Sequence, residues 1–348
     1  APDIFLQNAP QVVEQYDAPN NCVVLDNEPW VSRCTDADYL RYKGDGHIYA
    51  MPVYQPSSFF GGVYYNKEVM ADCGITDPNP QTYQEFLDIC QTVKDHGYTP
   101  IWMTDQDSWT TQVWTTVGWG VALDAKKDTI YDDLNTNKVD FQDVPEMVDV
   151  LQKLQDLYTA GYCNADHLSS PYASGQVAIG EKKAAMVIQG EWFVSACQAA
   201  YPDVQLGSFA IPFIDGADNK IAIGAFVLGG YVCKGENEEL AKQFLNYWSQ
   251  PEQMALIYAK NDVYPAFVDC EGNKIDPSIE NLVENYVKTG RYTYEFDSYF
   301  DSARPIMTDY LFGNIVECVA GSKTPEQALT DWNIKFEQYM AEMEYDGF

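Results

Sequence analysis

One segment constrains the fold more than any other: Gly180–Trp192, which reads GEKKAAMVIQGEW. Within it, Ala184–Ile188 is a short apolar run between a charged turn and a glycine, a pattern typical of a buried strand. Trp192–Ala200 follows with a helix-compatible sequence that stops before Pro202. Gly190 is therefore predicted to lie at a strand-to-helix turn. In open α/β sheets, ligands bind at the carboxyl ends of strands, where helix N-termini point.

The two residues at this turn, Glu191 and Trp192, offer complementary surfaces. A tryptophan provides a large flat apolar face, and a glutamate provides two hydrogen-bond acceptors. A sugar ring needs both surfaces, because it has an apolar C–H face and an equator of hydroxyl groups. The pattern also has a purely structural interpretation, in which Trp192 closes the hydrophobic core. Both interpretations stay open at this point.

The composition excludes several classes of function. The 348 residues are 46% hydrophobic and 21% charged, which indicates a folded chain of about two domains. Lys and Arg number 21 and Asp and Glu number 52, so the net charge is 21 − 52 = −31. Such a charge repels phosphate backbones, so we expect no nucleic-acid partner. Aromatic residues make up 14% of the chain, which is consistent with a polyhydroxylated ligand.

Cysteine and histidine spacing predicts neither a metal site nor a cofactor. The nine cysteines are scattered without a C-x-x-C pair, and only three histidines are present. We interpret most cysteines as small buried hydrophobes in a cell that does not routinely make disulfides. No run of 18 apolar residues occurs, so no membrane-spanning helix is expected. The first residues, Ala1–Phe5, resemble the interior of a domain, and an upstream piece with a signal peptide is expected.

Predicted strands and helices alternate along the chain without an internal repeat, which favours an α/β fold. Thr82 and Glu85 form a capping box that opens a helix to about His96, and Thr324 to Gln327 opens the last helix. The polar stretch Asp124–Asp143 is expected to be an exposed excursion.

Several segments together resemble one family, the extracellular solute-binding proteins of ABC importers, in the sugar-binding group that includes maltose-binding protein. Each matching piece is moderately specific, and their order and spacing extend over nearly the whole chain. The pieces are Pro2–Phe5, Ile48–Pro52, Tyr64–Lys67, Pro80–Phe86, Asn164–Asp166, Lys183–Met186, Gly190–Trp192, Asn237–Leu245 and Gly321–Ala328.

The resemblance implies two α/β lobes joined by a hinge that closes on the ligand. It places residues 1–55 and 228–288 in the first lobe and residues 56–227 and 289–348 in the second. The chain would cross near Gln55 and again within Gly224–Leu228. Family members begin with a strand, a long helix and a second strand before the Pro-Asp-Ile-Phe motif. Because these are absent here, the first lobe is expected to lack its N-terminal βαβ unit.

The resemblance also implies a set of ligand contacts, carried over position by position. Trp192 matches a tryptophan that stacks on the sugar, and Glu191 replaces the family's proline before it. The expected contact residues are Trp192, Glu191, Asn8, Gln7, Gln55, Trp109, Phe226 and Tyr264. For Gln7 and Gln55 the alternative is an exposed amide at a strand end, and for the aromatic residues it is core packing.

The predicted function is therefore extracellular capture of a carbohydrate, an oligosaccharide, for delivery to an ABC permease. No catalytic residue, metal or cofactor is implied, and the protein is expected to be a monomeric lipoprotein on the surface of a Gram-positive bacterium. Two alternatives remain. A cationic ligand such as a polyamine fits the same fold through Glu191 and cation–π contacts. A glycoside hydrolase also uses carboxylates and aromatic residues, although no carboxylate pair stands out by motif.

Overall fold

The structure is a computed structural model that describes residues 2–9, 13, 16–42, 44–55, 61–224, 227–260, 263–272, 276–300 and 310–348. Packing divides the chain into two compact units, and each is built from two separate stretches of sequence. Unit 1 comprises Ala1–Phe59 and Gly224–Ile275, and unit 2 comprises Phe60–Ile223 and Asp276–Phe348.

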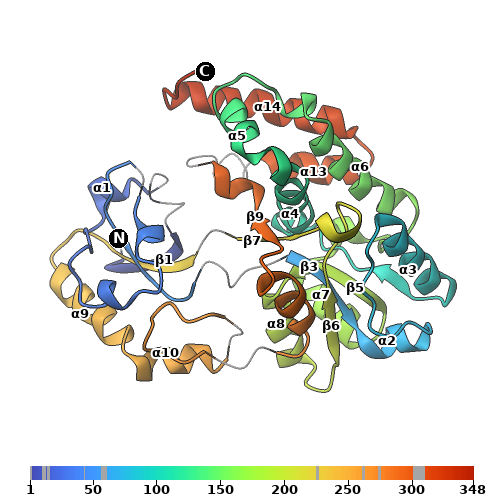
Figure 1. Ribbon diagram of the computed structural model, residues 1–348, viewed down its shortest axis with the longest axis horizontal. Coiled ribbons are helices and arrows are strands. Elements are labelled where there is room, and N and C mark those ends of the chain that lie inside the picture. The colour runs from blue at the N-terminus through green and yellow to red at the C-terminus, as the bar shows by residue number, and fades with distance from the viewer. Residues whose placement is uncertain are drawn as a thin grey trace. The chain divides into compact units, whose positions relative to one another are not determined.

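Unit 1 is organised around a three-stranded antiparallel sheet in the order β1-β8-β2 (Figure 1). The strands are β1 (Ile4–Ala9), β8 (Val227–Val232) and β2 (Ala50–Pro52). Gly230 in β8 lets helix α9 (Glu238–Trp248) pack closely, because a Cβ there would lie 3.0 Å from Cδ2 of Leu245. In its described residues, unit 1 also contains the α-helices α1 (Ala18–Asn21) and α10 (Pro251–Tyr258) and the 3-10 helices Val31–Arg33 and Asp38–Leu40.

Unit 2 contains a four-stranded sheet in the order β4-β5-β3-β6. The strands are β3 (Gly61–Asn66), β4 (Thr99–Ile101), β5 (Ala184–Gly190) and β6 (Leu206–Phe209). Every residue of β5 is buried, as the apolar run predicts. Helix α8 (Trp192–Ala200) follows at once, so the predicted strand-turn-helix is confirmed.

Helices cover both faces of this sheet. Because side chains alternate along β3, residues of this one strand contact helices on both faces. On one face, a Cβ at Gly61 would lie 2.6 Å from Cγ2 of Val117 in helix α4 (Gln112–Leu123). On the other face, the ring of Tyr64 lies 6.4 Å from that of Phe193 in α8, and α7 (Tyr172–Gly180) packs beside α8 (Figure 1).

The remaining helices of unit 2 form an outer layer. Helices α13 (Phe312–Val319) and α14 (Pro325–Glu342) lie against α6 (Pro145–Thr159), although they are far apart in sequence (Figure 1). The other elements are α2 (Lys67–Asp72), α3 (Tyr83–Asp95), α5 (Lys127–Asn135), α11 (Glu280–Leu282) and the parallel strands β7 (Ile221–Ile223) and β9 (Tyr292–Tyr294). The capping box predicted at Thr82 is present, and the helix start predicted at Thr324 is confirmed, where the structure also shows a capping box with Gln327. Among the described residues, no helix combines the length and apolar character needed to span a membrane.

The prediction that Asp124–Asp143 is an exposed excursion is wrong. The segment contains α5, and its apolar side chains, including Ile130, Tyr131 and Phe141, are buried in the core of unit 2. The ring of Tyr131 stacks on that of Tyr299 with centroids 3.9 Å apart. The many polar residues of the segment face outward, so the average composition concealed a helix with one buried side.

The structure also corrects one predicted lobe boundary. Residues 276–288, which were expected in the first lobe, pack in unit 2 beside β6. The Ser208 hydroxyl donates a hydrogen bond of 2.6 Å to the carbonyl of Ser278, and the Asn281 amide donates one of 3.0 Å to the carbonyl of Ser208. These bonds fasten the segment to the edge strand of the unit 2 sheet.

Candidate functional site

Three chain segments meet at one edge of the unit 2 sheet. β4 runs parallel to β5, with Ile101 opposite Met186, so the carboxyl ends of both strands lie at the same edge. Gly61, where β3 begins, pairs with Gly190, where β5 ends. The chain therefore enters unit 2 at this edge, and the loops after β4 and β5 lead there into α4 and α8.

Three aromatic side chains from the first turns of helical segments lie together at this edge, and we call Trp109, Tyr172 and Trp192 the aromatic cluster. Trp109 belongs to the 3-10 turn that leads into α4, and Tyr172 and Trp192 are the first residues of α7 and α8. The ring of Trp109 lies 5.2 Å from that of Tyr172 and 6.4 Å from that of Trp192. All three are only partly buried, so the cluster retains accessible aromatic surface.

Gly190 determines where the indole of Trp192 lies. A methyl group at Gly190 would be 2.1 Å from Cζ3 of Trp192, far inside van der Waals contact. The indole of Trp192 therefore fills the space that a side chain at position 190 would occupy. The glycine therefore acts on the site indirectly, by letting the tryptophan ring fold back over the end of β5.

We predict that Gly190→Ala weakens ligand binding, because the added methyl group forces the indole of Trp192 out of its place. The loss should approach that of removing the ring, about ten-fold or more in affinity. Titration calorimetry measures it. Gly180→Ala is the matched control, since its methyl group would lie 2.2 Å from Cγ of Tyr201 at the other end of α7. Equal affinity losses in the two variants would contradict the assignment.

A buried polar network positions the loop that carries Trp109. Asp105 accepts a hydrogen bond of 2.7 Å from the hydroxyl of Tyr158, and the same carboxylate oxygen lies 2.7 Å from Nδ1 of His167. Two residues on, Asp107 accepts a 2.7 Å hydrogen bond from the backbone N–H of Tyr172. This bond ties the loop after β4 to the start of α7 and holds two members of the aromatic cluster together.

Glu191 is largely inside unit 2, with 5% of its surface exposed. Burial raises the pKa of Tyr64 well above its usual value, and the nearby Glu191 carboxylate adds to the rise. Burial also raises the pKa of Tyr172 to about 12, against a hydrogen bond to Gln176 and with smaller contributions from Cys197 and Glu191. The carboxylate therefore lies close to two tyrosine side chains beneath the surface, and its contact with a ligand stays a prediction.

In unit 1, the structure brings Gln55 and Tyr264 together. The backbone N–H of Gln55 donates a 2.9 Å hydrogen bond to the carbonyl of Tyr264. The hydroxyl of Tyr258 fixes the two segments, because it donates to the carbonyl of Val53 at 2.9 Å and accepts from the N–H of Ala266 at 3.0 Å. Both predicted contact residues thus lie where the chain leaves the unit 1 sheet after β2.

Gln7 and Asn8 lie on β1 near the same end of that sheet. Gln7 and Pro52 both pair with Gly229, so they flank β8 at roughly 10 Å from each other. The side-chain oxygen of Gln7 accepts a 2.9 Å hydrogen bond from the N–H of Asn8. This bond fits the alternative role of Gln7, a local amide contact at a strand end. Its contact with a ligand stays a prediction. Phe226, the remaining predicted contact, lies outside the described residues.

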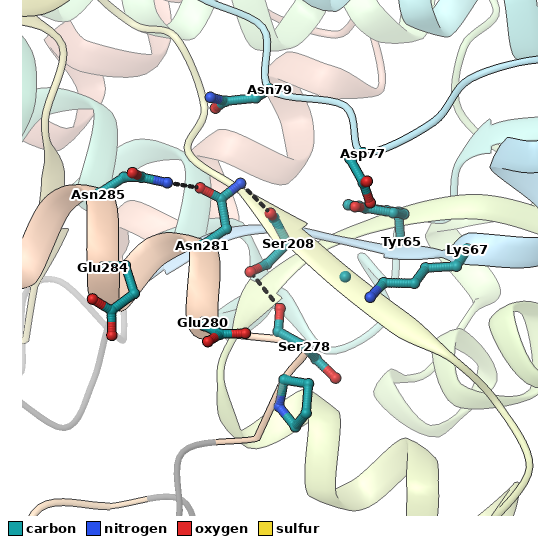
Figure 2. A pocket seen from close by; sticks show the side chains of 12 residues that line it. Tyr65, Lys67, Asp77, Asn79, Ser208, Ser278, Glu280, Asn281, Glu284 and Asn285 are labelled. Atoms are coloured by element: carbon teal, nitrogen blue, oxygen red, sulfur yellow. Dashed lines mark hydrogen bonds between the residues drawn. The ribbon is translucent and has the colours of Figure 1, made fainter.

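A pocket of about 410 Å³ opens elsewhere in unit 2, between the end of β3, β6 and the segment 277–285 (Figure 2). Tyr65, which lines this pocket, pairs with Gly207. Tyr65 lies four residues along β3 from Gly61, so the pocket is roughly 13 Å from the edge of the sheet where the aromatic cluster lies. Figure 2 shows that the Asn285 amide donates a hydrogen bond to the side-chain oxygen of Asn281. The Asn281 amide in turn donates one to the backbone carbonyl of Ser208.

This pocket lacks the features of a stacking site. Its one aromatic side chain, Tyr65, is buried, and a Cβ at Gly207 would lie 2.4 Å from Cζ of that ring. The lining is mainly amides and carboxylates, and it shares no residue with the aromatic cluster. Among the described residues, no group of three or more His, Cys, Asp or Glu side chains could hold a metal ion.

Sequence reasoning missed two residues of the site, Tyr172 and Asp107. Tyr172 follows Pro171 at the start of a predicted helix, in the same position that Trp192 occupies in its own helix. That shared position was the available signal. Asp107 precedes Trp109 by two residues, but its bond to the N–H of Tyr172 joins positions 65 residues apart and leaves no local pattern.

Comparison with known proteins adds a family and a fold. The sequence profile of a family described as "Bacterial extracellular solute-binding protein" matches residues 1–281. A curated relative, the "Multiple sugar-binding protein" of Streptococcus mutans serotype c (strain ATCC 700610 / UA159), is 24% identical over 283 residues. That match covers 78% of this chain and 64% of the relative, so the chain spans less than two thirds of the relative's length.

Solved structures resemble the whole chain. A "Chitin oligosaccharide binding protein" has a TM-score of 0.81 and 21% identity, and the match covers 98% of this chain and 84% of that one. A structure described as "SBP RafE in complex with raffinose" has a TM-score of 0.79 and 20% identity, and covers 97% of this chain and 85% of that one. These likenesses confirm the predicted fold class, a mixed α/β chain with the two-lobed solute-binding architecture.

Proposed function

Because the chain belongs to the family of bacterial extracellular solute-binding proteins, we propose that it captures a carbohydrate, an oligosaccharide, and delivers it to the permease of an ABC importer. The family consists of binding proteins and not of enzymes, and it acts outside the cytoplasm. The finer parts of the proposal are the sugar ligand, the permease partner and a lipid anchor on a Gram-positive cell surface.

The observation that carries the proposal is the aromatic cluster. Its three rings come from different helix starts and leave apolar faces accessible at the edge where strand carboxyl ends gather. A sugar ring stacks its C–H face on such a surface, and its hydroxyl groups need polar partners around the rim. Asp107 and Ser108, next to Trp109 in the chain, are partly exposed and are candidates for those contacts.

The names of the relatives support the same ligand class. One relative is described as a multiple sugar-binding protein, one solved structure as a chitin oligosaccharide binding protein, and another is in complex with raffinose. Each of the three descriptions therefore names a carbohydrate: several sugars, a chitin oligosaccharide and raffinose. The ligand class that we propose is therefore a neutral oligosaccharide.

Delivery to a permease requires a state that the ligand favours. We propose that the ligand binds the closed state of the chain more tightly than the open state, so that binding shifts the chain toward the closed state through this differential affinity. The permease then distinguishes loaded from empty protein by that state.

A cationic ligand is the second candidate, and it depends on an accessible carboxylate at Glu191. That side chain is nearly buried, which weakens the argument for charge recognition at this position.

A glycoside hydrolase would require turnover, and incubation of the chain with oligosaccharides followed by product analysis detects it.

A thermal-shift screen tests the proposal directly. Neutral mono- and oligosaccharides are compared with spermidine, and a ligand at 100 times its dissociation constant should stabilise the chain by about 2.7 kcal/mol. The proposal predicts a rise in melting temperature with an oligosaccharide, and compaction in small-angle scattering with the same sugar. Stabilisation by spermidine alone would contradict it.

A further inference from the structure

Two cysteines of unit 1 face each other across a short antiparallel bridge. Cys22 follows helix α1 and pairs with Cys233, which follows β8. The N–H of Val23 donates to the carbonyl of Val232 at 2.9 Å, and the N–H of Lys234 donates to the carbonyl of Asn21 at 2.8 Å. These two bonds flank the cysteines symmetrically, so Cys22 and Cys233 form the non-hydrogen-bonded type of antiparallel pair.

This type of pair brings two side chains closest together. The Cα atoms of a non-hydrogen-bonded pair are about 4.5 Å apart, and both Cβ atoms lie on the same face of the ladder. A disulfide requires Cα atoms about 4.4–6.8 Å apart and Cβ atoms that point toward each other. The backbone of this bridge therefore meets the requirement without moving, and a rotation of the side chains is sufficient to close the bond.

We propose that Cys22 and Cys233 are a site of oxidative modification. The two thiols present in this structure are oxidised to a disulfide across the antiparallel bridge. The oxidant is a low-molecular-weight disulfide, by thiol–disulfide exchange. Cys233 is partly exposed and reacts first, whereas Cys22 is 1% exposed and is reached only from its partner.

The chemistry balances in two steps. The thiolate of Cys233 attacks one sulfur of the oxidant, which forms a mixed disulfide and releases one small thiolate. The thiolate of Cys22 then attacks the sulfur of Cys233, and a second small thiolate leaves. Two protons pass from the cysteines to the two released thiolates. The pair of cysteines loses two electrons, and the oxidant is reduced by two.

The second step should be slow near neutral pH. Burial raises the pKa of Cys22 to about 11, with the neighbouring Cys233 adding to the rise and Lys234 opposing it. The thiolate of Cys22 is therefore scarce until the pH approaches that value, and the rate of closure is expected to rise with pH.

The bond would join distant parts of the sequence. It links the residue after α1 to the end of the central strand of the unit 1 sheet, and it encloses the stretch from Cys22 to Cys233, which includes residues 60–223 of unit 2. A family that acts outside the cytoplasm meets conditions in which such bonds persist.

Disulfide mapping tests the proposal on the unmodified chain. The folded protein is equilibrated at about pH 8 with mixtures of oxidised and reduced glutathione, quenched with acid, unfolded, alkylated and digested for mass spectrometry. We expect a linked peptide pair containing Cys22 and Cys233 and alkylation of the other seven of the nine cysteines. We also expect a higher urea midpoint for the oxidised form than for the reduced form.

Variants provide the controls. Cys22→Ser and Cys233→Ser should each abolish the linked pair and the shift in urea midpoint. Cys34→Ser should retain both, because Cys34 occupies a similar isolated bridge opposite Phe267 and has no thiol across from it. A mixed disulfide on Cys233 that persists at the most oxidising ratio with Cys22 still alkylated would overturn the proposal, whether or not the serine variants fold.

Discussion

Replacing Trp192 with alanine is expected to weaken carbohydrate binding by about 1–3 kcal/mol, or roughly five- to 150-fold in affinity. The reason is the loss of a flat apolar face that the aromatic cluster presents at the edge of the unit 2 sheet. Trp192 is only partly buried, so the free energy of unfolding should fall by less than the ~3–5 kcal/mol typical of a fully buried tryptophan. Titration calorimetry and a urea melt of the ligand-free protein measure the two effects separately.

Two variants make this prediction specific. Trp192→Phe keeps a flat ring and should retain most of the affinity. Trp248→Ala removes another partly buried tryptophan, on α9 of unit 1, and should leave the affinity unchanged. If Trp192→Ala lowered stability by the full amount for a core tryptophan and left the intrinsic affinity intact, Trp192 would be a core residue and the stacking assignment would fail.

Replacing Trp332 with alanine is expected to destabilise unit 2 by about 3–5 kcal/mol, because it opens a cavity in the hydrophobic core. Trp332 has no exposed surface and lies between two rings. It stacks on Phe141 with centroids 3.9 Å apart and on Trp119 with centroids 5.8 Å apart. It thereby joins α14 near the end of the chain to α4 and to the segment after α5.

Urea unfolding followed by circular dichroism measures this loss, with the transition of unit 2 analysed separately if the two units unfold apart. Ile334→Ala is the matched control, because Ile334 lies on the same helix but is 46% exposed. It should change the free energy of unfolding by about 0.5 kcal/mol or less. A Trp332→Ala protein as stable as the Ile334→Ala protein would show that the packing around Trp332 is wrong.

Local signals predicted the elements that they control. The apolar run at Ala184–Ile188 gave β5, and the glycine after it marked the turn into α8. The capping box at Thr82 and the Thr324–Gln327 segment, with Pro325 in the first turn, each predicted a helix start, because these local residues suit the free backbone N–H groups of a first turn. Each of these features depends on residues no more than a few positions apart.

Features that depend on distant partners could not be predicted in the same way. The burial of Tyr131 follows from its contact with Tyr299, 168 residues later, and composition alone suggested an exposed segment. The aromatic cluster needs Tyr172 beside Trp109, and the hydrogen bond that Asp107 accepts from the backbone N–H of Tyr172 holds the two segments together. The pairing of Cys22 with Cys233 likewise arises only when the residue after α1 meets the residue after β8, 211 positions later in the chain.

The most direct test of the central claim, that a sugar stacks on the aromatic cluster of unit 2, is saturation-transfer difference NMR with the oligosaccharide selected by the thermal-shift screen. Irradiation of the protein's aromatic protons should transfer saturation to the C–H protons on one face of a sugar ring. We expect this transfer to fall sharply in Trp192→Ala at a ligand concentration that keeps the variant saturated. The same pattern of transfer in Trp192→Ala and in the wild-type protein would contradict it.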